Sequence, residues 1–192
     1  MEPLIVAMAV VAISELGDKT QLVALVLANR LRRPWSIAAG LVVAMTIMHS
    51  LAAFGGAWLD RILPDQLMGW LVGLGFCLMG LWMAFSSEHS RQDIPRPTSK
   101  RHAFGVALLV FLTLEFGDKS QLATVGLAIA LEPAWMVGLG AILGSTVVTL
   151  PVIWLGYRLV HVIPHRLIRW LAIATFALVG VGVLVRQAIA VM

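Results

Sequence analysis

Six long apolar stretches alternate with short polar ones along the 192 residues of the chain. Each stretch reaches the roughly 20 residues that a helix needs to cross the hydrocarbon core of a bilayer. We therefore expect an all-α membrane protein with six transmembrane helices surrounded by lipid. The predicted spans are Pro3–Ala28, Trp35–Leu59, Leu67–Phe85, Ala103–Leu131, Trp135–Gly156 and Leu167–Met192.

The composition agrees with this class of protein. Apolar residues make up 60% of the chain and charged residues 12%, whereas a soluble domain carries about 25% charged residues. The formal net charge of +4 does not indicate nucleic-acid binding, because the basic residues lie in the short breaks between apolar runs. The lone Cys77 excludes an internal disulfide. The N-terminus lacks a basic stretch and a cleavage site, so we interpret the first apolar run as a permanent helix.

The two halves of the chain are copies of one another. When the sequence is shifted by 100 residues without a gap, 24 of the 92 overlapping positions are identical. Matches of charged, tryptophan and proline residues cannot come from shared apolar composition alone, so we infer a duplication. We expect a first three-helix repeat at residues 1–85, a cytoplasmic linker at 86–102 and a second repeat at 103–192.

Each predicted repeat has three spans, and three is odd. The second repeat must then enter the bilayer from the opposite side, which gives two inverted-topology repeats. Basic residues set the orientation, because they are concentrated in cytoplasmic loops. The breaks after the first, third and fifth spans, with the position just beyond, hold Arg30, Arg32, Arg33, Arg91, Arg96, Lys100, Arg101, Arg158, Arg166 and Arg169, against Arg61 and Arg186 on the other face. Both termini are therefore expected outside.

Four of the ten acidic residues lie in two matching motifs within the first and fourth spans. Residues 15–22 read Glu-Leu-Gly-Asp-Lys-Thr-Gln-Leu, and residues 115–122 read Glu-Phe-Gly-Asp-Lys-Ser-Gln-Leu. Each Glu lies roughly 18 Å along its helix, near the middle of the bilayer. Four unpaired carboxylates there would cost on the order of 10 kcal/mol, so we expect them to face one another and bind a compensating ion.

The oxygen-bearing residues of these motifs form a candidate metal site. Glu and Asp lie three residues apart, hence on one face of a continuous helix, and the following Gln and hydroxyl residues extend that face. Carboxylate, amide and hydroxyl oxygens suit hard divalent ions such as Mn²⁺, Ca²⁺ and Mg²⁺. The glycine of each motif permits close helix approach or local unwinding. The predicted metal ligands are Glu15, Asp18, Thr20, Gln21, Glu115, Asp118, Ser120 and Gln121.

Lys19 and Lys119 are expected to balance charge, in one of two ways. Each lysine follows the glutamate of its own motif by four residues, so the two can pair along one helix. Alternatively, the lysines act as gating ions that fill the acidic site when the metal leaves. Four carboxylates less two lysines leave a charge of −2, which one divalent cation or two protons would neutralise. His49, inside the second span, is open to a structural role or to a role as a proton relay.

The doubled motif Glu-x-Gly-Asp-Lys-(Thr/Ser), on the first and fourth of six spans, resembles that of the MneA-type manganese exporters. These are bacterial relatives of the Golgi and chloroplast manganese/calcium–proton exchangers. The resemblance covers nearly the whole chain, and it implies export of a divalent cation from the cytoplasm. It also implies Mn²⁺ as cargo rather than Ca²⁺, a bacterial inner membrane, and Glu15, Asp18, Glu115 and Asp118 as ligands.

Other classes of function remain open from the residues. The same carboxylates would suit the selectivity ring of a cation channel. An intramembrane aspartyl protease is a weaker alternative, because a lysine beside each aspartate opposes the shared proton that such catalysis needs. We expect no enzyme activity and no cofactor. The oligomeric state and the choice between Mn²⁺ and Ca²⁺ do not follow from the sequence.

Overall fold

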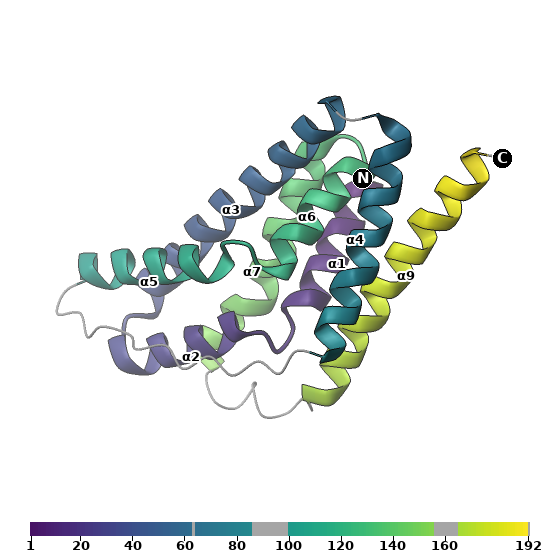
Figure 1. The fold of residues 1–192 in the computed structure, drawn as a ribbon. Helices are drawn as coiled ribbons and strands as arrows, with labels where there is room; N and C mark the ends of the chain where they lie inside the picture. The colour runs from purple at the N-terminus through teal and green to yellow at the C-terminus, as the bar shows by residue number, and fades with distance from the viewer. Residues whose placement is uncertain (63, 86–99, 156–164, 192) are drawn as a thin grey trace.

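A computed structural model describes residues 1–62, 64–85, 100–155 and 165–191 of the chain (Figure 1). Within these residues the protein consists of helices and contains no strand. The prediction of an all-α protein is therefore confirmed for the described part of the chain. The helices are α1 (Glu2–Glu15), α2 (Lys19–Leu31), α3 (Pro34–Ile62), α4 (Asp65–Phe85), α5 (Lys100–Glu115), α6 (Lys119–Ala130), α7 (Ala134–Leu155) and α9 (His165–Val191).

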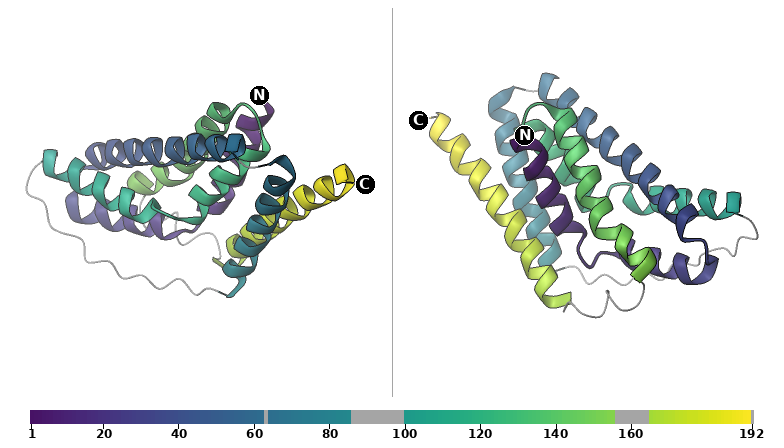
Figure 2. Two further views of the ribbon diagram at one scale, coloured as in Figure 1. Left: turned by 45° about the horizontal axis from the view of Figure 1, so that its top comes forward. Right: turned by 180° about the vertical axis from the view of Figure 1, so that it is seen from behind.

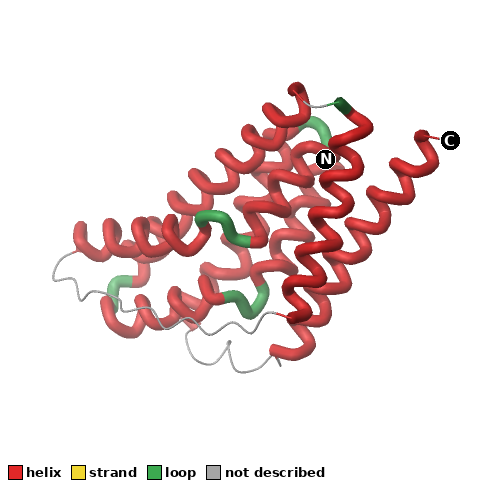
Figure 3. The backbone as a smooth tube through the Cα atoms, viewed as in Figure 1, coloured by secondary structure: helices red, strands yellow, loops and turns green. Residues whose placement is uncertain are grey.

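The first and fourth predicted spans are each divided into two helices. One break separates α1 from α2, and the other separates α5 from α6. Both appear as short loop segments inside the molecule in Figure 3. Neither Pro3–Ala28 nor Ala103–Leu131 is therefore one continuous helix, and of the two roles predicted for the motif glycines the structure shows local unwinding. The physical reason lies in the motifs, whose glycines allow the chain to leave the helical conformation at these points.

Helix ends differ from the predicted span ends by a few residues. α3 begins at Pro34, whose fixed φ suits the first turn of a helix, and it continues to Ile62. α5 begins at Lys100, inside the predicted 86–102 linker, because lysine and arginine are good helix formers. The rest of that linker, at 86–99, and most of the predicted break at 157–166 lie outside the described residues.

The helix pairs that pack together follow the internal repeat. α1 packs along α7, and α5, the repeat equivalent of α1, packs along α3. Glycine makes both approaches close. A Cβ at Gly140 would meet the Leu4 carbonyl oxygen, and a Cβ at Gly40 would lie 2.8 Å from the Ala107 Cβ. α4 and α9 run side by side along one flank of the molecule (Figures 1 and 2).

Two clusters of buried apolar side chains hold the helices together, and they are not equivalent. The first, here called the Phe111 cluster, draws on α2, α3, α5 and α7. The second, the Phe76 cluster, draws on α1, α3, α6 and α7 and also on α4 and α9. The Phe111 cluster comprises Val23, Ala24, Leu27, Ile37, Ala38, Leu41, Ala44, Met45, Ala107, Phe111, Leu114 and Ile153. The Phe76 cluster comprises Ala7, Val10, Ala53, Val72, Phe76, Ala123, Leu127, Ala128, Val137 and Phe176.

Two of the described helices, α3 and α7, are by themselves long and apolar enough to cross a membrane. Half or slightly more of each apolar window is buried inside the protein. The two helices pack against each other, and α3 also contacts α5 and α6. The pair therefore forms a central element to which both broken helices attach.

The close approach of α1 and α7 gives a prediction about stability. We expect Gly144→Ala to destabilise the protein by about 2 kcal/mol, because the added methyl would meet the Met8 carbonyl oxygen, a backbone atom that cannot move aside. Gly55→Ala in α3 is the matched control, since its Cβ would meet nothing within 4 Å and alanine favours a helix over glycine. Thermal unfolding of the protein purified in detergent measures both. Equal melting temperatures for the two variants would contradict this packing.

Candidate metal site at two helix breaks

The two motifs build the two helix breaks in the same way. Gly17 and Gly117 have φ values of 70° and 71°, a conformation that costs other residues roughly 1–2 kcal/mol. The following aspartates are extended, with φ and ψ of −73° and 165° at Asp18 and −74° and 163° at Asp118. Each glutamate thus ends one helix, and each aspartate directly precedes the next. A sequence of Glu-x-Gly-Asp is therefore what positions the break.

The two motif glutamines hold the breaks in place. The Gly17 N–H donates a hydrogen bond to Gln21 Oε1 at 3.1 Å, and the Gly117 N–H donates to Gln121 Oε1 at 2.7 Å. These bonds satisfy backbone groups that the interrupted helix would leave without partners. The sequence-based set included both glutamines as metal ligands through these oxygens. In the structure each of these oxygens accepts a hydrogen bond from its own loop, and its role as a metal ligand stays a prediction.

Three of the four motif carboxylates converge. Glu15, Glu115 and Asp118 each offer one oxygen, and these oxygens lie within 4.8 Å of one another. Both glutamates are fully buried, and Asp118 is 9% exposed. The expectation that Glu and Asp share one face of a continuous helix is wrong, because the break lies between them. The carboxylates meet because the two breaks bring the helix ends together.

The lysines pair across the two motifs. Lys119 Nζ lies 2.6 Å from Asp18 Oδ1, and Lys19 Nζ lies 2.7 Å from Asp118 Oδ1. The predicted pairing of Lys19 with Glu15 along one helix is wrong, because the break between them removes the spacing of a continuous helix. The two ion pairs join the first half of the chain to the second. The Lys19 side chain is 30% exposed and that of Lys119 is 10% exposed.

Hydroxyl groups donate hydrogen bonds to Glu115, whereas Glu15 has no hydrogen-bond partner in the part of the chain that the structure describes. Thr20 Oγ1 donates to Glu115 Oε1 at 2.8 Å, and Ser120 Oγ donates to Glu115 Oε2 at 3.3 Å. Both oxygens of Glu15, and Oδ2 of Asp118, are buried with no hydrogen-bond partner in the described part of the protein. Buried carboxylate oxygens in this condition are costly. A cation or protons between them would remove that cost.

A second polar group lies beside the site and was only partly foreseen. His49 Nδ1 lies 2.9 Å from Thr124 Oγ1, and that hydroxyl donates to the Ser120 carbonyl at 2.8 Å. The sequence drew attention to His49, but it did not single out Thr124. The signal for Thr124 was its offset of four residues from Ser120, which puts both on one face of α6.

The chain is similar to known membrane transport proteins over most of its length. The model of one protein family, described as divalent cation/proton antiporter GDT1, matches residues 3–91 and 103–190. A protein of Vibrio cholerae named "Putative manganese exporter" is 31% identical over 184 residues, which cover 95% of this chain and 90% of that protein. A GDT1-like protein of Synechocystis is 30% identical over 162 residues, which cover 71% of this chain and 74% of its own. No solved structure matches.

The positive φ of the second break gives a test of the motif glycine. A Cβ at Gly117 would meet nothing within 4 Å, so a substitution there changes only the backbone preference. We expect Gly117→Ala to lower the stability by about 1–2 kcal/mol and Gly117→Asn to lower it less, because asparagine tolerates this conformation. Thermal unfolding of the two purified variants compares them directly. An alanine variant as stable as the unaltered protein would contradict the break geometry.

Proposed function

Since the chain belongs to the family of divalent cation/proton antiporters, we propose that it exports Mn²⁺ from the cytoplasm in exchange for protons. Glu15, Glu115 and Asp118 are the proposed ligands. The observation that supports this set is the convergence of their oxygens within 4.8 Å in a buried site. Three of those carboxylate oxygens lack any hydrogen-bond partner among the described residues, so they gain most from a bound cation.

The charge of the site supports exchange of one cation for two protons. Four carboxylates and two lysines carry −2 when every group is ionised. Each aspartate already has a lysine within 2.7 Å, which leaves the charges of Glu15 and Glu115 to be balanced. One divalent cation or two protons supplies that balance. The buried charge then stays near zero in both states, which avoids the high cost of a net charge in a membrane.

Mn²⁺ is the proposed cargo, and Ca²⁺ is the alternative. The ligand set contains only oxygen, which suits both ions and disfavours metals that prefer imidazole or thiolate. The name of the Vibrio cholerae relative refers to manganese, and this supports the choice of Mn²⁺. Competition between the two ions for the purified protein would rank them.

The proposed membrane arrangement has six spans in two inverted repeats. In this arrangement α1 with α2, and α5 with α6, each make one broken span, and α3, α4, α7 and α9 make the others. The matching helix breaks and the matching pairs α1–α7 and α3–α5 support it. Both termini lie at the same end of the molecule (Figures 1 and 2), as six spans require. We place that end outside the bacterial inner membrane.

Alternating access is the proposed mechanism, and the two apolar clusters support it. With the termini outside, the Phe76 cluster lies on the outer side of the carboxylates and the Phe111 cluster on the cytoplasmic side. Among the described side chains, α4 and α9 contribute to the Phe76 cluster alone. The arrangement corresponds to a state closed toward the outside. Transfer of the α4–α9 pair to the Phe111 cluster would open the outer side.

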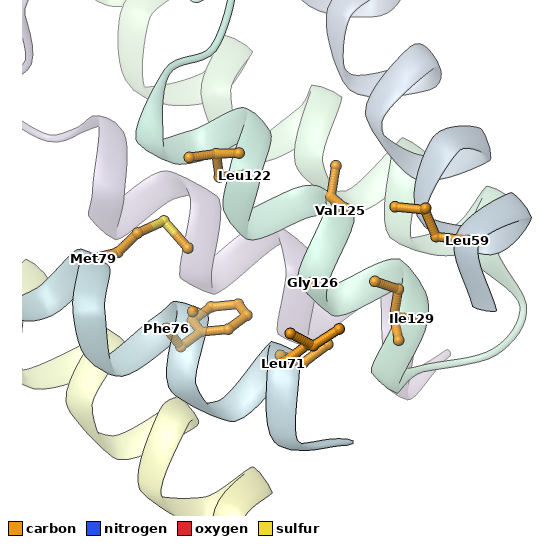
Figure 4. Close-up of a pocket in the computed structure, with 10 residues that line it drawn as sticks. Leu59, Leu71, Phe76, Met79, Leu122, Val125, Gly126 and Ile129 are labelled. Atoms are coloured by element: carbon orange, nitrogen blue, oxygen red, sulfur yellow. The ribbon is translucent and has the colours of Figure 1, made fainter. Parts of the chain in front are cut away.

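Gly126 is the position in α6 against which the Phe76 ring packs in the proposed outer closure. A Cβ at this position would lie 2.5 Å from Cε2 of the Phe76 ring, which faces α6 next to Gly126 in Figure 4. The repeat equivalent of Gly126 is Val26, so the first half lacks this glycine. A groove of about 410 Å³ adjoins Phe76 between α3, α4 and α6, and its ten lining residues are all uncharged. It offers no ligand for a cation and belongs to the apolar closure.

The alternatives are less well supported by the same observations. A channel needs an open path, whereas every described helix except α2 and α5 contributes to the Phe76 cluster on one side of the site. An aspartyl protease needs two aspartates that share a proton. Here each aspartate is ion-paired with a lysine of the other motif.

The ligand assignment predicts the behaviour of Glu15→Gln. We expect this variant to lose Mn²⁺ efflux and Mn²⁺-dependent thermal stabilisation, which amounts to about 2.7 kcal/mol at a cation concentration 100 times the Kd. Without metal its melting temperature should equal or exceed that of the unaltered protein, because a buried unpartnered carboxylate has been removed. Asp60→Asn, outside the site, is the control. If Glu15→Gln keeps both Mn²⁺ efflux and Mn²⁺-dependent thermal stabilisation, Glu15 is not a ligand of the cation.

The proposed outer closure predicts the effect of Gly126→Val. The added side chain would displace the Phe76 ring and favour the state open to the outside. The readout is labelling of Ala53→Cys, in a Cys77→Ala background, by a membrane-impermeant thiol reagent added outside the cell. We expect faster labelling when Gly126→Val is present and no change with Gly182→Val, whose Cβ would meet nothing within 4 Å. Unchanged labelling in both would contradict this closure.

A further inference from the structure

His49 is fully buried in α3, yet among the described residues only one of its two ring nitrogens has a hydrogen-bond partner. Nδ1 lies 2.9 Å from Thr124 Oγ1. Nε2 is buried and has no hydrogen-bond partner within the described residues. A buried imidazole with an unpartnered nitrogen is costly if its role is structural, because that nitrogen has given up its hydrogen bonds to water.

The hydrogen bonds fix which nitrogen carries the proton. Thr124 has a single hydroxyl proton, and it donates that proton to the Ser120 carbonyl oxygen at 2.8 Å. The Thr124 oxygen must therefore accept from His49, so Nδ1 carries the hydrogen. In the neutral ring Nε2 then presents a lone pair. That nitrogen is ready to accept a proton.

His49 lies next to the carboxylate site without being part of it. Ser120, which accepts the bond from Thr124, donates its own hydroxyl to Glu115 at 3.3 Å. Beyond His49 along α3, Ala53 belongs to the Phe76 cluster. In the proposed orientation, His49 thus lies between the carboxylates and the outer closure, where protons would enter.

The surrounding helices leave His49 few charged neighbours. α2 begins with Lys19, α6 begins with Lys119, which follows Asp118, and α5 ends with Glu115; α7 contains no ionisable residue from Ala134 to Leu155. The repeat equivalents of His49 and Thr124 are Thr149 and Ala24. The imidazole therefore accompanies only one of the two motifs.

We propose that His49 is the proton-binding residue on the outer side of the site, which accepts an entering proton at Nε2 and delivers it to the carboxylates after the cation has left. The proton forms an N–H bond at Nε2, and that bond breaks when a carboxylate oxygen takes the proton. The ring returns to its neutral form, with Nδ1–H still bonded to Thr124. This role rests on the proposed cation/proton exchange.

His49→Asn tests the proposal in proteoliposomes. The asparagine amide can keep the hydrogen bond to Thr124 but has no nitrogen that binds a proton at physiological pH. We expect Mn²⁺-dependent thermal stabilisation and ⁵⁴Mn²⁺ self-exchange at equal pH on both sides to stay within about twofold of the unaltered protein. Uptake driven by a pH gradient should fall by at least about tenfold, since proton transfer by a positioned group contributes a factor of that size or more. Its dependence on pH should flatten.

Thr149→Val is the matched control, because Thr149 occupies the equivalent position and its buried hydroxyl has no partner among the described residues. All three measurements should be unchanged in this variant. Equal losses in all three for His49→Asn would mean a structural role and overturn the proposal, as would normal gradient-driven uptake. Absence of gradient-driven uptake in the unaltered protein would instead refute the exchange itself.

A second variant keeps the proposal testable if His49→Asn does not fold. Thr124→Val keeps the imidazole but removes the acceptor of its Nδ1–H. We expect gradient-driven uptake to persist with its pH profile displaced, while self-exchange at equal pH is preserved. An unchanged pH profile would show that the imidazole does not take part in proton movement.

Discussion

The ion pairs between the two motifs are the interaction on which the site depends. Four carboxylates are brought together among apolar helices, and in lipid this is possible only if most of their charge is cancelled. Lys119 with Asp18, and Lys19 with Asp118, cancel half of it. Because each pair joins one repeat to the other, the same contacts dock the two halves and set the charge of the site. The two glutamates remain, and their combined charge of −2 is the charge that one divalent cation balances.

The helix breaks place the aspartates and the glutamates in different electrostatic environments. Each aspartate directly precedes a helix, at the positive end of the helix dipole, where a negative charge is favoured. Each glutamate is the last residue of a helix, at the negative end, where a second negative charge is disfavoured and a cation is favoured. One backbone feature, a positive-φ glycine between Glu and Asp, thus creates two different environments three residues apart. A continuous helix would have made the two acids neighbours on one face.

Much of this was open to prediction from the sequence. Hydropathy located the six apolar segments, and the internal repeat identified which polar residues belong together. The acidic motifs stood out because charged residues in long apolar runs demand compensation. Predictions that assumed an unbroken helix were wrong, above all the pairing of Lys19 with Glu15 and the placing of Glu and Asp on one helix face. Glycine signalled that a break was permitted there, but propensity alone does not decide whether tertiary contacts will use it.

Contacts between the repeats could not be predicted from either repeat alone. Thr124 bonds to His49, which lies 75 positions away in sequence. Phe76 contacts Gly126 because α4 packs against α6. Among the described residues, α4 and α9 contribute to the Phe76 cluster and not to the Phe111 cluster, which also could not be predicted from one repeat. A duplicated sequence favours a symmetric arrangement, and the departure from symmetry comes from differences such as Gly126 against Val26, whose effect depends on the neighbouring ring.

We propose that Glu15 and Glu115 together bind one divalent cation or two protons in turn. Mn²⁺ uptake into proteoliposomes under an imposed pH gradient, with the membrane potential held at different values by K⁺ and valinomycin, tests it most directly. We expect Mn²⁺ to accumulate beyond its equilibrium concentration, driven by the pH gradient and insensitive to the potential. Uptake that stops at equal concentrations, or that follows the potential instead of the pH gradient, would contradict it.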